Sequence, residues 1–273
     1  MQAGDESPTG QATLEWSPLA NGPSSISYRE FGAGPCLLIL HGGWGYQAYP
    51  FAAQIRLLAD HYRIVIPDRS GYGSSTPIDQ LGRDFHGRAM LEMLAFLDQL
   101  DVHEAIWWGH SDGAVIAAHA GMKHPERCRA LILEALHFSP TKPHSREFFQ
   151  RMASNPDSFG TGLAARLGDE HGADRWRRVL ELDGQAWLDI AAAAGSDADL
   201  YEGRLGTIGA PTLLLHGEAD PRSEPGELEA IRAALPNAVV DLYPQAGHSP
   251  HSEPLTAEVT SQSALRFLQS LSS

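Results

Sequence analysis

The feature that most constrains the fold is a series of continuous apolar runs, each as long as a β-strand, separated by segments with helical spacing. Strands that are apolar on both faces are typical of a parallel sheet covered by helices on both sides. The pattern therefore predicts an α/β fold with a mostly parallel, doubly wound sheet. The uninterrupted runs are 37–40, 64–66, 105–108, 131–133 and 212–215, and the segments 26–31 and 238–243, which alternate more, are expected to be flanking strands, antiparallel toward the N-terminus.

Helical spacing fills most gaps between these runs. Apolar residues recur every three or four positions from 51 to 58 and from 90 to 100, and a last helix is expected after Ser252, an N-cap candidate, with Pro254 in its first turn. Between 138 and 209 no strand run occurs. Since a plain crossover needs only about a dozen residues, this segment is interpreted as a helical insertion. Its short helices are expected around 148–149, 163–167, 176–182 and 186–194.

Composition excludes several classes of protein. With 34 acidic and 20 basic residues the chain carries a net charge of −14, which argues against nucleic-acid binding. No segment approaches the roughly 18 apolar residues of a membrane span, and the first residues lack an apolar signal segment, so a cytoplasmic protein without a membrane partner is expected. The two cysteines, Cys36 and Cys128, lie in apolar runs and are expected to be buried and reduced.

Residues 109–113, Gly-His-Ser-Asp-Gly, have the pattern G-x-S-x-G between an apolar run and a small, apolar helical segment. In that context the pattern is typical of a sharp strand-to-helix turn that exposes a nucleophilic serine. Both glycines are needed there, because a Cβ at either position would collide inside the turn. Ser111 is therefore the predicted nucleophile; in the alternative interpretation it only caps the helix.

A serine becomes a strong nucleophile when a histidine takes its proton and an acid orients that histidine. Asp220 and His248 each follow an apolar run, at 212–215 and 238–243. Loops at the carboxyl ends of neighbouring parallel strands converge on one crevice. We therefore expect both side chains to meet Ser111.

Each role has an alternative. His251 is close to His248 in sequence, but it lacks a preceding glycine that lets the loop turn toward the site. Glu134 ends the run 131–133 and is an alternative acid. The pair of histidines also suggests a metal site, but no third ligand has suitable spacing, so no metal or cofactor is expected.

The order Ser, Asp, His, together with LHGGWG at 40–45 and DRSGYGSS at 68–75, resembles the α/β-hydrolase family. The resemblance extends from about residue 26 to 267 and is closest to small capped serine esterases and C–C hydrolases. It implies an eight-stranded sheet and a core domain formed by residues 1–137 and 210–273. Residues 138–209 would then form a helical cap, or lid, inserted in the core.

The resemblance also implies an oxyanion hole, in which two backbone N–H groups stabilise the charged oxygen of the reaction intermediate. Asp112 would supply one N–H and Gly43 the other, with Trp44 as the alternative to Gly43. His41 is expected to brace this loop rather than to react.

The predicted function is hydrolysis of a carboxylic ester of a small substrate through an acyl-enzyme on Ser111. The same triad serves C–C bond hydrolases of vinylogous diketones and lactonases; in the C–C case an arginine must hold a substrate carboxylate, for which Arg69 and Arg177 are candidates. A non-catalytic ligand-binding member of the fold is a further alternative. The sequence gives no information on the oligomeric state.

The acidic residue after the nucleophile has two interpretations. The Asp112 carboxylate stabilises the start of a helix through the helix dipole. If it faces the crevice instead, it opposes the charge of the oxyanion and favours a cationic substrate such as an α-amino ester.

Overall fold

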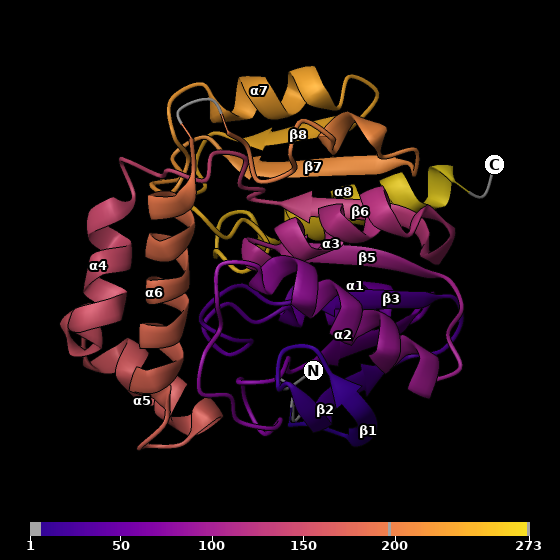
Figure 1. Ribbon diagram of the computed structural model, residues 1–273. Coiled ribbons are helices and arrows are strands. Elements are labelled where there is room, and N and C mark those ends of the chain that lie inside the picture. Colours follow the sequence, from indigo (N-terminus) through magenta and orange to yellow (C-terminus); the bar gives the residue numbers. More distant parts are fainter. Residues whose placement is uncertain (1–6, 196–197, 272–273) are drawn as a thin grey trace.

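The computed structural model describes residues 7–195 and 198–271 and is built around one eight-stranded sheet, in the order β1-β2-β4-β3-β5-β6-β7-β8 (Figure 1). Strands β1 and β2 are antiparallel, β2 is antiparallel to β4, and all other neighbours are parallel. This confirms the predicted α/β class. The strands are β1 (Gly10–Ser17), β2 (Gly22–Phe31), β3 (Cys36–Leu40), β4 (Arg63–Pro67), β5 (Ala105–His110), β6 (Cys128–Glu134), β7 (Thr212–Gly217) and β8 (Val239–Tyr243).

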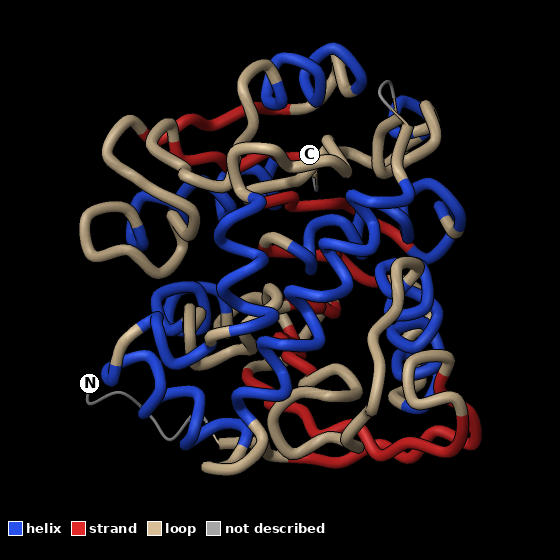
Figure 2. Tube along the Cα trace, turned by 60° about the vertical axis from the view of Figure 1, so that its left-hand side comes forward, coloured by secondary structure: helices blue, strands red, loops and turns tan. Residues whose placement is uncertain are grey.

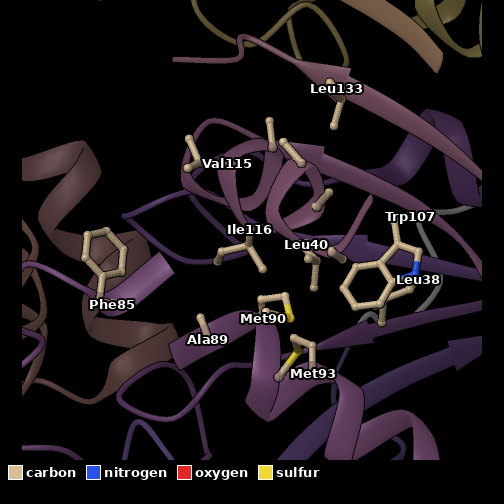
Figure 3. Close-up of a cluster of buried hydrophobic side chains, with 14 of the residues drawn as sticks. Leu38, Leu40, Phe85, Ala89, Met90, Met93, Trp107, Val115, Ile116 and Leu133 are labelled. Atoms are coloured by element: carbon tan, nitrogen blue, oxygen red, sulfur yellow. The ribbon is translucent and has the colours of Figure 1, made fainter. Parts of the chain in front are cut away.

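Two apolar clusters explain why the central runs are continuous. In β3, Leu38 and Leu40 belong to the cluster that includes α2 (Phe85–Gln99) and α3 (Asp112–Lys123). Leu37 and Ile39 belong to the cluster on the opposite face, with α1 (Ala52–Leu58) and α8 (Ala257–Ser270). Figure 3 shows part of the first cluster, where side chains of β3, β5 and β6 meet those of α2 and α3. Each central strand therefore buries both faces.

The segment between β6 and β7 is helical, as predicted. It contains α4 (Arg146–Ser154), α5 (Thr161–His171), α6 (Trp176–Ala193) and the 3₁₀ turns Pro156–Phe159 and Leu205–Thr207. These helices stand together on one side of the sheet (Figure 1), and Figure 2, which brings that side forward, shows them lying across the ends of the strands. The remaining elements are α7 (Glu227–Ala234) and a 3₁₀ turn at Pro125–Arg127.

Two expected helices, at 176–182 and 186–194, are wrong as separate elements, because α6 is one helix of 18 residues. Gly184 lies in the expected gap. A Cβ there would come within 2.7 Å of Phe149 O and of Met152 Cβ in α4. The glycine is therefore required by the close packing of α4 on α6.

The last helix also begins later than expected. Thr256 precedes its first residue, whereas Ser252 and Pro254 lie in the turns before it. In these turns the Glu253 carboxylate accepts hydrogen bonds from the backbone N–H groups of Gly247, at 2.9 and 3.1 Å, and of Ser249, at 3.0 Å. The segment is thus used to fix the loop that carries His248.

Other expectations concern burial and membranes. Cys36 and Cys128 are unpaired and buried, and burial raises the pKa of their thiols to about 11 and about 12. No helix in the described part of the chain has both the length and the apolar character needed to cross a membrane.

Candidate active site

Ser111 lies at the turn between β5 and α3, with a φ of 55° that a non-glycine residue rarely adopts. A Cβ on Gly109 would lie 2.0 Å from Gly113 O, and a Cβ on Gly113 would lie 2.2 Å from Leu40 O. The predicted need for two glycines is confirmed. The first brings α3 close to β5 and the second brings it close to β3, so Ser111 is held at the carboxyl end of the sheet.

The structure brings Ser111, His248 and Asp220 together. His248 Nε2 is 3.0 Å from Ser111 Oγ, and His248 Nδ1 is 3.0 and 2.9 Å from the two carboxylate oxygens of Asp220. Burial alone would raise the pKa of Asp220, but the adjacent His248 and the backbone N–H of Arg222 hold it well below its ordinary value. The carboxylate therefore stays ionised and accepts the Nδ1 proton, which leaves Nε2 free to accept a proton from the serine.

The alternative acid and base form a separate pair. His251 Nδ1 is 2.8 Å from Glu134 Oε1, and its Nε2 is 3.0 Å from Tyr49 O. The other Glu134 oxygen accepts a hydrogen bond from Trp108 Nε1 at 3.1 Å, and the His251 ring stacks on Phe51. The backbone carbonyl of Glu134 accepts a hydrogen bond from Ser111 N–H at 2.9 Å, but within the described residues neither side chain of the pair is hydrogen-bonded to Ser111 or His248. These contacts suit a structural role, in which the pair supports the loop that carries His248.

The loop after β3 passes beside Ser111. Within the described residues, the backbone N–H groups of Gly43, Trp44 and Asp112 have no protein acceptor, which leaves them free to bind an anion. His41 braces this loop as expected: its Nδ1 donates to Gly42 O at 2.7 Å, and burial holds its pKa well below the ordinary value.

The two arginines considered for a substrate carboxylate are wrong for that role. Arg69 is buried and donates to His41 O at 2.6 Å and to Gly42 O at 3.3 Å, so it stabilises the loop. Arg177 is exposed and paired with Asp157 at 2.7 and 2.9 Å. The arginine that does line the pocket is Arg222, which the sequence analysis did not single out.

The cavity beside Ser111 is small and lined largely by aromatic and charged side chains. Its volume of about 30 Å³ accommodates one or two water molecules. A larger substrate therefore requires movement of the side chains that α4 and α6 contribute. The aromatic lining residues are Trp44, Tyr49, Phe148, Phe149 and Trp187.

Two carboxyl groups line the same cavity. Asp112 is buried, and its Oδ1 accepts hydrogen bonds from Trp187 Nε1 at 3.0 Å and from His86 Nε2 at 3.1 Å. A Cβ on Gly43 would lie 2.8 Å from Asp112 Oδ2 and 2.2 Å from Asp183 Oδ2, so the two carboxyl groups converge beside that glycine. The Asp112 side chain therefore faces the crevice. Asp183, on α6, has no motif around it and was not predicted.

Burial and the charge of Asp112 raise the pKa of Asp183 well above its ordinary value. The folded protein keeps this proton over a pH range in which the unfolded chain has lost it, so stability should fall as pH rises from about 4 toward the folded-state pKa. We expect Asp183→Asn to remove that loss, with a gain of about 1 kcal/mol, or roughly 2–4 °C in Tm, at pH 8 and little gain at pH 4. The measurement is the Tm of the wild type and of the variant, determined by thermal unfolding at several pH values between 4 and 8. Asp189→Asn, an exposed site on the same helix, is the control; an equal gain there would contradict the prediction.

His137, which follows β6, is a further residue that sequence reasoning missed. Its Nε2 lies 3.3 Å from Ser111 Oγ, and it lines the cavity. The only sequence signal was its position just beyond the end of a predicted parallel strand, where side chains reach the same crevice as Ser111.

Comparisons with known proteins show the family to which the chain is similar. A family model described as alpha/beta hydrolase fold matches residues 35–188, which is more than half of the chain. The chain is 29% identical over 246 residues to the pimeloyl-(acyl-carrier protein) methyl ester esterase of Chromobacterium violaceum, covering 83% of this chain and 92% of that protein. With the Yersinia enterocolitica protein of the same name it is 37% identical over 101 residues, which span 37% of this chain and 36% of that protein.

Two further similarities extend over most of the chain. The putative carbamate hydrolase RutD of Pseudomonas syringae pv. syringae is 26% identical over 254 residues, covering 84% of this chain and 92% of that protein. The crystal structure of a hydrolase from Pseudomonas aeruginosa superimposes with a TM-score of 0.70 at 25% identity, covering 95% of this chain and 98% of that one.

Proposed function

The chain belongs to the α/β-hydrolase fold family, and from that membership we propose that it is a serine hydrolase that cleaves a carboxylic ester of a small substrate. The observation that carries the proposal is the chain of contacts from Asp220 through His248 to Ser111 Oγ, with no distance above 3.0 Å. Relatives named as methyl ester esterases support the choice of an ester. Residues 138–209 act as the cap over the site, and residues 1–137 and 210–273 as the core.

The proposed reaction has two halves. His248 takes the Ser111 proton while Oγ bonds to the ester carbon, and the N–H groups of Gly43 and Asp112 bind the resulting oxyanion. The intermediate then releases the alcohol, which receives the proton from His248. Water attacks the acyl-enzyme in the same manner, and the acid leaves as Ser111 regains its proton.

Cleavage of a C–C bond is a second candidate, and Arg222 is the observation that favours it. The guanidinium lines the cavity and packs on the Phe148 ring, 3.2 Å from its centroid. It makes no ion pair with any described residue. A substrate carboxylate would supply the missing counter-charge.

A fluorophosphonate probe and a series of p-nitrophenyl esters test the proposal. We expect the probe to add one label per chain, and Ser111→Ala to abolish the label. Because the cavity is small, kcat/KM should be at least about tenfold higher for acetate than for octanoate. An unlabelled wild-type protein without esterase activity would overturn the proposal, whereas a labelled protein that cleaves vinylogous diketones faster than esters would favour the C–C alternative.

The carboxyl pair beside Gly43 refines the substrate class to esters with a positively charged amine. In the described part of the chain, Asp112 Oδ2 and Asp183 Oδ1 receive no hydrogen bond from any other residue. The proton kept on Asp183 is the one donor within the pair, and a substrate ammonium would supply further donors. Hydrogen bonds to charged groups contribute about 1.5–3 kcal/mol, so kcat/KM for an α-amino ester should exceed that for its N-acetylated form roughly tenfold or more. Asp112→Asn should remove the preference and Asp189→Asn should keep it. Equal kcat/KM for both esters in the wild type would contradict this refinement.

A further inference from the structure

Two imidazoles contact the hydroxyl of Ser111. His248 Nε2 lies 3.0 Å from Oγ and His137 Nε2 lies 3.3 Å from it, and the two rings are nearly parallel, with centroids 5.7 Å apart. We propose that His137 is a second catalytic histidine, which donates a hydrogen bond to Ser111 Oγ and accelerates the step in which this oxygen leaves the acyl group. The inference rests on the proposed function, since it concerns the acyl-enzyme on Ser111.

Proton counting assigns the role of donor to His137. The serine hydroxyl has one proton, and His248 Nε2 accepts it because the Nδ1 proton of His248 faces Asp220. The hydroxyl oxygen can then only accept a hydrogen bond from the second ring. His137 is therefore the tautomer with its proton on Nε2.

The surroundings of His137 keep it neutral. Burial, followed by the positive charge of Lys142 and by His248, holds the pKa of His137 well below the ordinary value. A neutral ring with its proton on Nε2 directs its lone pair, on Nδ1, away from Oγ. His137 therefore does not compete with His248 for the serine proton.

Contacts from three segments hold His137 in place. Its backbone carbonyl oxygen accepts a hydrogen bond from Tyr201 Oη at 2.6 Å, and its imidazole ring packs edge-to-face on Trp187 of α6 with centroids 5.2 Å apart. The Glu227 carboxylate accepts from the next two backbone N–H groups, those of Phe138 and Ser139, at 2.7 and 2.8 Å. The donor is thus held in place before the substrate binds.

The hydrogen bond has different effects on the two halves of the reaction. Before acylation, Oγ is a hydroxyl that already accepts it, so little is gained as Oγ attacks. In the acyl-enzyme, Oγ is an ester oxygen and a weak acceptor. When water has added to the acyl carbon and given its proton to His248, the C–Oγ bond breaks, its electron pair returns to Oγ, and His248 delivers the proton there. The hydrogen bond from His137 strengthens as this charge develops, so it stabilises the transition state more than the ground state.

Burst kinetics with p-nitrophenyl acetate separate acylation from deacylation. We expect His137→Phe and His137→Asn to slow deacylation about ten- to a hundredfold, the range for a hydrogen bond to a charged group. Acylation should change by less than about threefold, so kcat and KM fall together and a burst of one nitrophenol per enzyme grows. His137→Gln should restore deacylation to within about threefold, since its amide nitrogen reaches the position of Nε2, whereas that of asparagine reaches only Nδ1.

The outcomes are distinguishable. Equal slowing of both steps, or a glutamine variant as slow as the asparagine variant, would show that His137 is only structural. Unchanged deacylation in both loss variants would also overturn the inference. If His137→Phe does not fold, the comparison of deacylation rates between His137→Asn and His137→Gln still tests the inference. Absence of fluorophosphonate labelling in the wild type would instead overturn the proposed function itself.

Discussion

Ser111→Ala is expected to lower kcat for an ester substrate by about 10⁴- to 10⁶-fold, since it removes the atom that bonds to the acyl group. The residual activity should still exceed the rate in water, because the free N–H groups of Gly43 and Asp112 and the pocket remain. KM should change little by comparison. The substitution removes one oxygen at the surface of a small cavity, so the fold and the Tm should be preserved.

Steady-state kinetics with a p-nitrophenyl ester, together with thermal unfolding, measure this effect. Ser158→Ala, an exposed serine in the turn after α4, is the matched control and should retain full activity. A variant at Ser111 that keeps more than about one-hundredth of the wild-type kcat would show that another group performs the attack.

Local patterns predicted the fold and the sharp turn that carries Ser111. The continuous runs in β3, β5 and β6 are a direct consequence of burial on both faces, so a single sequence reveals them. Strand β1 received no range of its own, because its apolar residues, such as Ala12 and Leu14, alternate with polar ones. The turn at Ser111 is specified by glycines within four residues of one another. Asp220 and His248 could be inferred because each follows a recognisable strand.

The remaining site residues depend on how distant segments pack. Asp183 reaches Asp112 only because α6 forms one helix that packs tightly on α4 at Gly184, and no local pattern predicts which face of that helix turns inward. Arg222 is two residues from Asp220, but its position over Phe148 is set by the placement of α4. The choice between Glu134 and Asp220 likewise depends on the three-dimensional arrangement, since Glu134 ends β6, Asp220 follows β7, and both strands end at the same crevice.

Replacement of that acid has the second large expected effect. Asp220→Asn should lower kcat about 10⁴-fold while the substrate still binds. The Asp220 carboxylate accepts the Nδ1 proton of His248 and so keeps the acceptor nitrogen toward Ser111. An asparagine amide donates to Nδ1 instead, which moves the ring proton to Nε2, where it faces the serine and blocks proton transfer.

Glu134→Gln provides the contrast that assigns the acid. The Glu134 carboxylate is hydrogen-bonded to His251 and Trp108, and leaving a buried polar group without its partner costs about 1–3 kcal/mol, so this variant should lose stability while its folded fraction keeps kcat within about tenfold of the wild type. Kinetics at a temperature well below each variant's Tm separate the two effects. A larger loss of kcat in Glu134→Gln than in Asp220→Asn would assign the acid to Glu134. The opposite result places the acid on the loop after β7, because Asp220 is the one carboxylate among the described residues that is hydrogen-bonded to the His248 ring.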